Sequence, residues 1–413
     1  MRTTFAPLQE PNYRRYFVGQ ALSLVGTYMH VVATGWLVLS LSHSGAVLGA
    51  LMAAQLGPWL VLGAYAGVII DRVNTRNLVF FGNAVDSLLC ALLAVLCLTG
   101  TITVPLVFAF GITLGLSATF TVPAQQAFVS EMVGVAELKS AVTLTNMMGS
   151  VARVVGPACA GLLIANANIG FCFALNAVSY LAVLIALTRM RAGALATPEP
   201  TARGRRQVRE GLRYAWSRSE LLLPLLMMAV IGTFAYEFQV SLPLMAKGSF
   251  HGGATAYGLM TGAMGVGALL GGVFINHRLG LGVRWLTRLS LAFAATISLA
   301  AAAPSLATEL VTLVLVGAAS AGFMATASST LQLGSVPQMR GRVTALWGLA
   351  VMGSTAIGAP VVGAVAGADS PRAGLALGAI ACILCAAGGW STHRRREVSS
   401  SENAEPYLAN SAR

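Results

Sequence analysis

The chain has 413 residues, of which 56% are hydrophobic and 10% are charged, and its mean hydropathy is +0.75. A soluble domain of this composition would have too little polar surface to present to water, so the chain is predicted to lie in lipid. The formal net charge of +12 is carried mainly by short loops between apolar segments. Such loops suit contact with anionic lipid and contain no recognisable nucleic-acid-binding element, so no nucleic-acid partner is expected.

Twelve apolar stretches of about 20 residues follow one another along the chain, each long enough as a helix to cross a hydrocarbon core of about 30 Å. They cover residues 16–41, 46–70, 78–98, 104–121, 141–165, 171–188, 221–246, 254–276, 285–303, 309–331, 343–367 and 374–392. Runs this long and uniform do not fit the alternating strands of a membrane barrel. We therefore predict an all-α integral membrane protein with twelve transmembrane helices.

Basic residues recur at every second break between these stretches, as in residues 14–15, 72–76, 340–342 and 394–396, and the intervening breaks contain very few of them. Membrane insertion keeps basic loops in the cytoplasm. With an even number of spans, both termini are therefore predicted to be cytoplasmic. The first apolar stretch follows a polar segment and lacks a cleavage pattern, so we interpret it as a retained helix and not as a signal peptide.

A long basic segment divides the chain into two halves. Residues 189–220 carry two prolines and eight arginines, whereas the other loops are short. We predict an N-terminal six-helix bundle in residues 1–188, a cytoplasmic linker in 189–220, a C-terminal six-helix bundle in 221–392 and a disordered cytoplasmic tail in 393–413. Short motifs recur in the two halves, which is typical of a transporter with its site between two repeats near the bilayer midplane.

Several motifs resemble those of the major facilitator superfamily. Gly67-x-x-x-Asp71-Arg72-x-Asn74-x-Arg76 resembles the signature between its second and third helices. Arg153-x-x-Gly156-Pro157-x-x-x-Gly161 is similar to the fifth-helix motif of its proton-coupled antiporters. The resemblance covers about residues 11–392 and is to the branch with bacterial drug exporters and the enterobactin exporter. It implies the major facilitator fold, a multi-pass location in the bacterial inner membrane and secondary transport.

The resemblance also implies roles for these motif residues. Gly67, Asp71, Arg72 and Arg76 would form a cytoplasmic gate whose charges bridge the halves, and arginines 278, 340 and 342 fall where further gate contacts are expected. Ordinary topogenic charge is the alternative for the arginines. In the fifth helix, the glycines and Pro157 would allow bending and close approach to a neighbour, with simple packing as the alternative.

The branch that this chain resembles often has carboxylates in the first and fourth helices, but Thr27 and Thr121 stand at these places here. Proton-coupling groups are therefore expected at other positions. An ionisable group at membrane depth costs at least about 2.5 kcal/mol, so each one retained there needs a reason. Glu237 is our first candidate, because Thr233, Glu237 and Ser241 would form one polar stripe. The resemblance implies that this helix lines the central cavity. The alternative is a simple hydrogen bond from Glu237 to a neighbouring helix.

Two further ionisable residues complete the proton-coupling candidates. His30 belongs to a similar stripe with Thr27 and Thr34, and it changes charge near neutral pH. The alternative for His30 is a hydrogen bond at a helix interface. Asp86 is the other candidate, and its alternative is an ion pair with Arg153, which would lower the cost of both charges.

Weakly polar and aromatic residues on the predicted spans are candidates for the wall of a substrate cavity. They are Thr27, Thr34, Trp36, Ser117, Phe120, Thr121, Thr233, Tyr236 and Ser241. Such a surface suits amphiphilic cargo better than sugars or phosphates, with core packing or lipid contact as the alternative for each residue. No catalytic constellation, nucleotide-binding loop or metal-ligand set occurs in the sequence, so we expect no enzyme activity, no cofactor and no metal.

These observations together predict a monomeric secondary transporter that exports small amphiphilic compounds or drugs against proton entry. Export of a siderophore or another metabolite, and uptake, are alternatives within transport. A membrane protein that senses or scaffolds without transporting is the alternative from another class.

Overall fold

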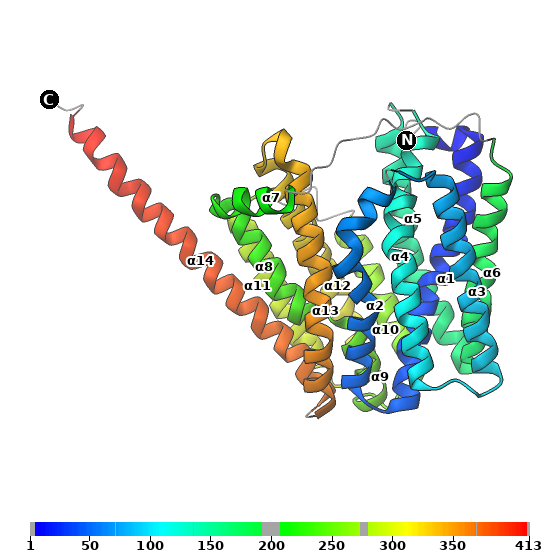
Figure 1. Cartoon of the computed structure of the whole chain (residues 1–413). Coiled ribbons are helices and arrows are strands. Elements are labelled where there is room, and N and C mark those ends of the chain that lie inside the picture. Colours follow the sequence, from blue (N-terminus) through cyan, green and yellow to red (C-terminus); the bar gives the residue numbers. More distant parts are fainter. Residues whose placement is uncertain are drawn as a thin grey trace.

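The computed structural model describes residues 5–70, 72–134, 136–191, 207–272, 280–368 and 370–410, and the regular structure in these ranges is helical. Six long helices form the first part of the chain: α1 (Pro11–Ser42), α2 (Gly45–Ile70), α3 (Thr75–Leu98), α4 (Val104–Met132), α5 (Leu138–Asn166) and α6 (Ile169–Thr188). They stand side by side as one bundle (Figure 1). This bundle corresponds to the predicted N-terminal half.

Within the described residues, eight α-helices form the second part of the chain. They are α7 (Gln207–Trp216), α8 (Ser219–Ala235), α9 (Phe238–Gly248), α10 (Ala254–Leu270), α11 (Val283–Ala301), α12 (Leu306–Gly334), α13 (Arg340–Ala368) and α14 (Pro371–Asn410). Most of them form a second bundle, while α7 lies across its end and α14 extends away from it (Figure 1). The helix α14 covers most of the segment expected to be a disordered tail, because a helix that is already nucleated propagates into polar residues at little cost.

Ten segments of the described chain are long and apolar enough to cross a membrane, and α8 with α9 count together as one of them. The helix α10 has 17 residues and is a shorter apolar helix. The helix α11 has 19 residues and carries Arg284 and Arg288 in its first two turns. These two helices occupy the places of the remaining predicted spans.

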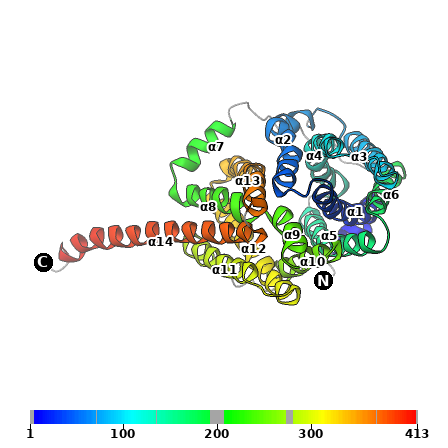
Figure 2. The same cartoon turned by 90° about the horizontal axis from the view of Figure 1, so that it is seen from below.

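Two helix pairs make the most extensive contacts between the bundles, α2 with α13 and α5 with α10, and Figure 2 shows both pairs as neighbours. Glycines allow the first approach, since a Cβ on Gly49 would overlap the Ala359 carbonyl. In the second pair, the Thr255 hydroxyl donates a hydrogen bond to the Gly161 carbonyl at 3.2 Å. Lys247 Nζ of α9 also donates to the Leu39 carbonyl of α1 at 3.2 Å. These contacts cluster toward the end of the molecule that carries the α1–α2 and α9–α10 connections.

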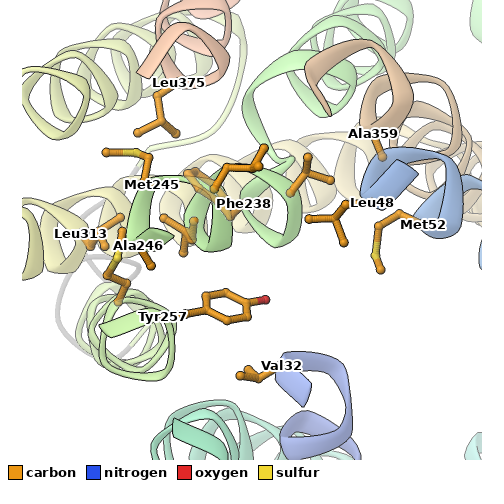
Figure 3. Packing of buried hydrophobic residues seen from close by; sticks show 14 of the residues in the cluster. Val32, Leu48, Met52, Phe238, Met245, Ala246, Tyr257, Leu313, Ala359 and Leu375 are labelled. Atoms are coloured by element: carbon orange, nitrogen blue, oxygen red, sulfur yellow. The ribbon is translucent and has the colours of Figure 1, made fainter. Parts of the chain in front are cut away.

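A buried apolar cluster continues from one bundle into the other at this end. Figure 3 shows Leu48 of α2 beside Ala359 of α13, and Tyr257 of α10 pointing toward Val32 of α1. Lipid tails are as apolar as these side chains, so hydrophobic burial alone does not hold the bundles together. The close backbone contacts at glycine are therefore the main structural reason for their association.

Candidate functional site

The seventh predicted span is broken in two at Tyr236 and Glu237, which separate α8 from α9. The helix restarts when the amides of Val240 and Ser241 donate to the Glu237 carbonyl at 3.1 and 3.0 Å. A break of this kind leaves backbone polar groups without partners inside the helix. At membrane depth, such irregular backbone is tolerated only where protein or a water-filled space surrounds it, which is why broken helices often mark transport sites.

The carboxyl group of Glu237 is buried at this break. Only 3% of the residue is exposed, and its Oε1 atom has no hydrogen-bond partner among the described residues. The Thr355 side chain of α13 lies beside the same carboxyl group. An unpaired carboxylate is costly in such surroundings, so this group is suited to gain and lose a proton as its surroundings change.

Of the other residues in the predicted stripe, Thr233 adjoins the same helix as Glu237, α13, whereas Ser241 adjoins α14. Thr233 donates to the Ala229 carbonyl of its own helix at 2.6 Å, and its backbone abuts Gly358 of α13. Ser241 is buried and faces Gly374 of α14 instead. The i, i+4, i+8 rule holds only within a continuous helix, and the break at Glu237 separates these residues.

Tyr236 points into the C-terminal bundle. Its hydroxyl donates to the Ser320 carbonyl of α12 at 2.7 Å, and its ring centroid lies 5.3 Å from that of Phe293 in α11. Tyr236 therefore packs among helices of its own half rather than extending toward the N-terminal half.

A polar cluster lies inside the N-terminal bundle around Asp86 of α3. This residue is 8% exposed, its Oδ1 atom lacks a hydrogen-bond partner within the described ranges, and the Ser117 side chain of α4 lies beside it. Ser117 Oγ is 3.5 Å from Thr121 Oγ1, and Thr121 packs directly on Gly82 of α3. The structure thus brings three of the predicted site residues together.

His30 extends this cluster, because its Nδ1 atom lies 3.8 Å from Cys90 Sγ, one turn after Asp86 on α3. Cys90 in turn accepts a hydrogen bond from Asn176 Nδ2 of α6 at 3.5 Å. Thr27 Oγ1 lies 3.4 Å from the hydroxyl of Tyr180, also on α6. His30 and Thr27 therefore face the interior of their own bundle.

Cys90, Asn176 and Tyr180 also belong to this cluster and were not predicted from the sequence. The four-residue spacings from Asp86 to Cys90 and from Asn176 to Tyr180 place each pair on one helix face, and this signal was available in the sequence.

Arg153 does not pair with Asp86, contrary to the alternative considered from the sequence. Its Nε and Nη2 atoms donate to the Tyr28 hydroxyl of α1 at 3.3 and 3.1 Å, and no ion pair within 4 Å joins it to Asp86. The reason is the arrangement of the helices: α5 packs on α1 and α10, whereas Asp86 on α3 lies against α4.

The glycines of the fifth-helix motif lie at close contacts. A Cβ on Gly156 would lie 2.7 Å from the Val25 carbonyl oxygen of α1, and one on Gly161 would lie 3.1 Å from the Ala254 carbonyl oxygen of α10. Pro157 is inside the helix and faces Gly258 of α10. The helix α5 therefore packs closely on one helix of each bundle, α1 and α10.

The remaining cavity candidates lie in different surroundings. Thr34 is buried, and its hydroxyl has no hydrogen-bond partner in the part of the chain described. Trp36 is partly buried against the cluster that joins the bundles. Phe120 packs instead on a second cluster at the other end of the N-terminal bundle.

The gate motif is only partly described. Asp71 lies outside the described residues, Gly67 belongs to the last turn of α2, and the side chain of Arg72 is exposed. Arg76 Nη2 donates to the Leu187 carbonyl near the C-terminus of α6 at 2.6 Å. A cation is favourable at that end of the helix dipole, so in this conformation Arg76 stabilises a contact within its own half.

An ion pair attaches α7 to α13, since Arg342 Nη1 lies 2.7 Å from Glu210 Oε2. The two side chains are 30% and 51% exposed, and exposed pairs contribute only about 0–1 kcal/mol. We expect Glu210→Gln to lower the free energy of unfolding by less than about 1 kcal/mol. Thermal unfolding of the purified protein at low and high salt measures this, and a larger loss at high salt would contradict a surface ion pair.

Comparison with known proteins gives matches along the whole chain. Residues 2–409 match the family described as transmembrane secretion effector. The Staphyloferrin A transporter of Staphylococcus aureus is 26% identical over 174 residues, which are 42% of this chain and 44% of that protein. The MFS-type transporter YfiS of Bacillus subtilis is 24% identical over 271 residues, 63% of this chain and 62% of that protein. The chain thus spans less than two thirds of the length of these curated relatives.

The fold is shared with solved structures of membrane transporters. A bacterial homolog to the human lysosomal transporter Spinster, in an inward-facing and unoccupied conformation, superposes with a TM-score of 0.74 at 14% identity. The alignment covers 94% of this chain and 98% of that one. At this identity the likeness concerns the fold alone.

Proposed function

Because the chain belongs to the transmembrane secretion effector family of the major facilitator superfamily, we propose that this membrane transporter exports small amphiphilic compounds in exchange for protons. The observation that carries the proposal is the buried carboxyl of Glu237, whose Oε1 is unpaired at a helix break. A carboxyl that changes its protonation in each cycle supplies the coupling between the proton gradient and the movement of cargo.

The proposed topology has twelve spans, made of the ten apolar segments with α10 and α11. The basic residues near positions 14, 72 and 342 lie at one end of the molecule, which the positive-inside rule assigns to the cytoplasm. Both termini are then cytoplasmic. The glycine contacts between α2 and α13 lie toward the opposite, outer end, which supports an inward-facing conformation in a bacterial inner membrane.

Transport in this proposal proceeds by alternating access of two rocking halves. Glu237 accepts a proton from outside as cargo leaves, and it releases the proton inside after the outer contacts close. His30 and Asp86, which share an internal cluster through Cys90, provide a second site for a proton. Asp71 and its neighbours in the gate motif close the inner end when the halves rock together. The protein acts as a monomer.

Export of a siderophore is a second candidate function. The similarity of this chain to the Staphyloferrin A transporter favours it. It differs from drug export in cargo alone, so the same coupling residues serve both functions.

Efflux from inverted vesicles with an imposed pH gradient tests the proposal. We expect a panel of amphiphilic dyes and siderophores to include compounds that accumulate in vesicles with the protein and not in matched empty vesicles. A protonophore should abolish this accumulation. Accumulation that persists with the protonophore would contradict proton antiport, and no accumulation of any compound would favour a sensor or scaffold.

A further inference from the structure

Arg153 is a cation near the middle of the long helix α5 (Leu138–Asn166), and its side chain is exposed. A guanidinium group is costly at membrane depth unless it faces water, an anion or another polar group. No carboxylate of the described residues lies within 4 Å of it. The proton-coupling roles proposed for Glu237, His30 and Asp86 do not involve this positive charge.

Arg153 lies on a part of α5 that adjoins helices of both halves. Its carbonyl oxygen would lie 3.0 Å from a Cβ on Gly265 of α10, in the C-terminal half. One turn later, Gly156 packs on the backbone of α1, in the N-terminal half. Figure 2 shows α5 beside both α1 and α10. The backbone at Arg153 thus adjoins α10 of the C-terminal half, and its guanidinium contacts Tyr28 of α1 in the N-terminal half.

Tyr28, the partner of Arg153, occupies the same boundary. It lies seven residues, or two turns, before Gly35, so both residues lie on one face of α1. A Cβ on Gly35 would lie 3.4 Å from the Tyr257 hydroxyl oxygen of α10. This face of α1 is therefore turned toward the C-terminal half, in contrast to the face of Thr27 and His30.

The pair retains hydrogen-bond donors for a ligand. The Tyr28 oxygen accepts two N–H groups of Arg153, so the tyrosine's own hydrogen is available to another acceptor. A guanidinium has five N–H donors in a planar fork, of which three remain. The fork and the hydroxyl together match the two oxygens of a carboxylate.

Charge balance selects a monoanion. Arg153 supplies one positive charge, which neutralises one carboxylate and leaves a phosphate dianion half compensated. The residues next to Arg153 and Tyr28 in the sequence, such as Val154 and Met29, are apolar and suit the hydrophobic part of an amphiphile. We propose that Arg153 and Tyr28 form the binding subsite for the anionic end of the cargo, an amphiphile with one carboxylate. This inference rests on the proposed export function and specifies its substrate class.

Binding of two matched probes to the purified full chain tests the subsite. The probes are 1-naphthaleneacetate and its neutral amide, measured by titration calorimetry in detergent at pH 8, where the acid is ionised. We expect the wild-type protein to bind the carboxylate about 10-fold or more tightly than the amide, because a bidentate charged pair is lost with the amide. Equal affinities for the two probes, or no binding of the carboxylate, would overturn the proposal.

Variants of Arg153 and Tyr28 test whether these two residues cause the preference for the carboxylate over the amide. Arg153→Gln should remove the preference for the carboxylate over the amide, and Tyr28→Phe should reduce this preference by a smaller factor. Arg218→Gln is the matched control, because Arg218 also stacks on a tyrosine, with Cζ 5.0 Å from the Tyr214 ring centroid, but lies outside the membrane spans. If Arg153→Gln unfolds, Arg153→Lys keeps the charge without the fork and should retain only part of the preference. A full preference in the folded arginine variants would overturn the assignment.

Transport of the same probes into inverted vesicles separates this inference from the export proposal. If wild-type binding shows the Arg153-dependent preference but neither probe accumulates, the export function fails and the subsite stands. If both probes accumulate equally in wild-type and Arg153→Gln vesicles, the subsite is overturned and export stands.

Discussion

Efflux driven by a proton gradient is expected to fall to the background rate when Glu237 is replaced by glutamine. The amide has nearly the same volume as the carboxylic acid and keeps a group beside Thr355, but it cannot bind or release the coupling proton. The free energy of unfolding should change by less than about 1.5 kcal/mol, because the substitution conserves volume. Initial rates in inverted vesicles with an imposed pH gradient, together with thermal unfolding, measure both effects.

Exchange without a gradient sharpens this test. A variant that cannot move protons is still able to bind cargo and rock, so Glu237→Gln should retain exchange of labelled for unlabelled cargo across the membrane. Loss of exchange as well as gradient-driven efflux would assign Glu237 to cargo binding or to folding instead of coupling.

Glu309→Gln provides a control of equal burial. Glu309 is fully buried near the start of α12, and its Oε1 also lacks a hydrogen-bond partner within the described chain. Its Oε2 accepts a hydrogen bond from Thr312 in the next turn at 3.3 Å, and it lies in a continuous helix. Gradient-driven efflux should survive this substitution. Equal losses in the two variants would mean that removing any buried carboxyl impairs the protein.

The helices were predictable from the sequence because lipid leaves the chain few alternatives to helix. Their ends were harder to place. The fourth stretch was predicted to stop at Thr121, before Pro123, but α4 continues to Met132 with that proline inside it. A proline removes one backbone hydrogen bond, and neighbouring helices in a membrane bundle compensate for the loss. The signal that ends a helix in water is therefore weaker here.

Glu237 could be singled out from the sequence because it is a rare charge in an apolar stretch, but the helix break at which it lies could not be predicted. The break at Tyr236–Glu237 contains neither glycine nor proline, so no residue there indicates it. Periodicity treats a span as one helix and places Thr233 and Ser241 on the same face as Glu237. In the structure Thr233 and Glu237 both adjoin α13, whereas Ser241, beyond the break, adjoins α14. That difference depends on tertiary packing.

The contacts of charged side chains also could not be predicted from the sequence. Opposite charge suggested that Asp86 and Arg153 pair, yet Asp86 lies beside the uncharged Ser117, and Arg153 donates to the uncharged Tyr28. Which helices adjoin decides these contacts, and one sequence does not contain the neighbour relations of twelve similar segments. The same limit applied to His30, whose contact with Cys90 depends on how α1 packs on α3.

Outer closure of the transporter is expected to fail when Gly49 of α2 is replaced by alanine. The added methyl would overlap the Ala359 carbonyl of α13, where backbone allows little movement. Overpacking of this kind costs about 1–3 kcal/mol. Since about 1.4 kcal/mol changes an equilibrium tenfold, the substitution should shift the population away from the inward-facing state by about 5- to 150-fold.

Hydrogen exchange of backbone amides measures this shift. Peptides from the start of α2 and the end of α13 should exchange faster in Gly49→Ala than in the wild-type protein, and the rate of efflux should fall. Unchanged exchange in these peptides would mean that the glycine contact does not hold the outer end closed.

Gly63→Ala on the same helix distinguishes packing from helix propensity. The atoms nearest to a Cβ at Gly63 belong to the Trp59 ring one turn earlier, at 3.6 to 3.9 Å, which is ordinary contact. Alanine favours helix over glycine by about 1 kcal/mol, and this methyl group does not overlap α13. Gly63→Ala should therefore keep efflux and slow exchange in α2 slightly. Opposite effects of the same methyl group at Gly49 and at Gly63 would then follow from the α13 backbone beside Gly49.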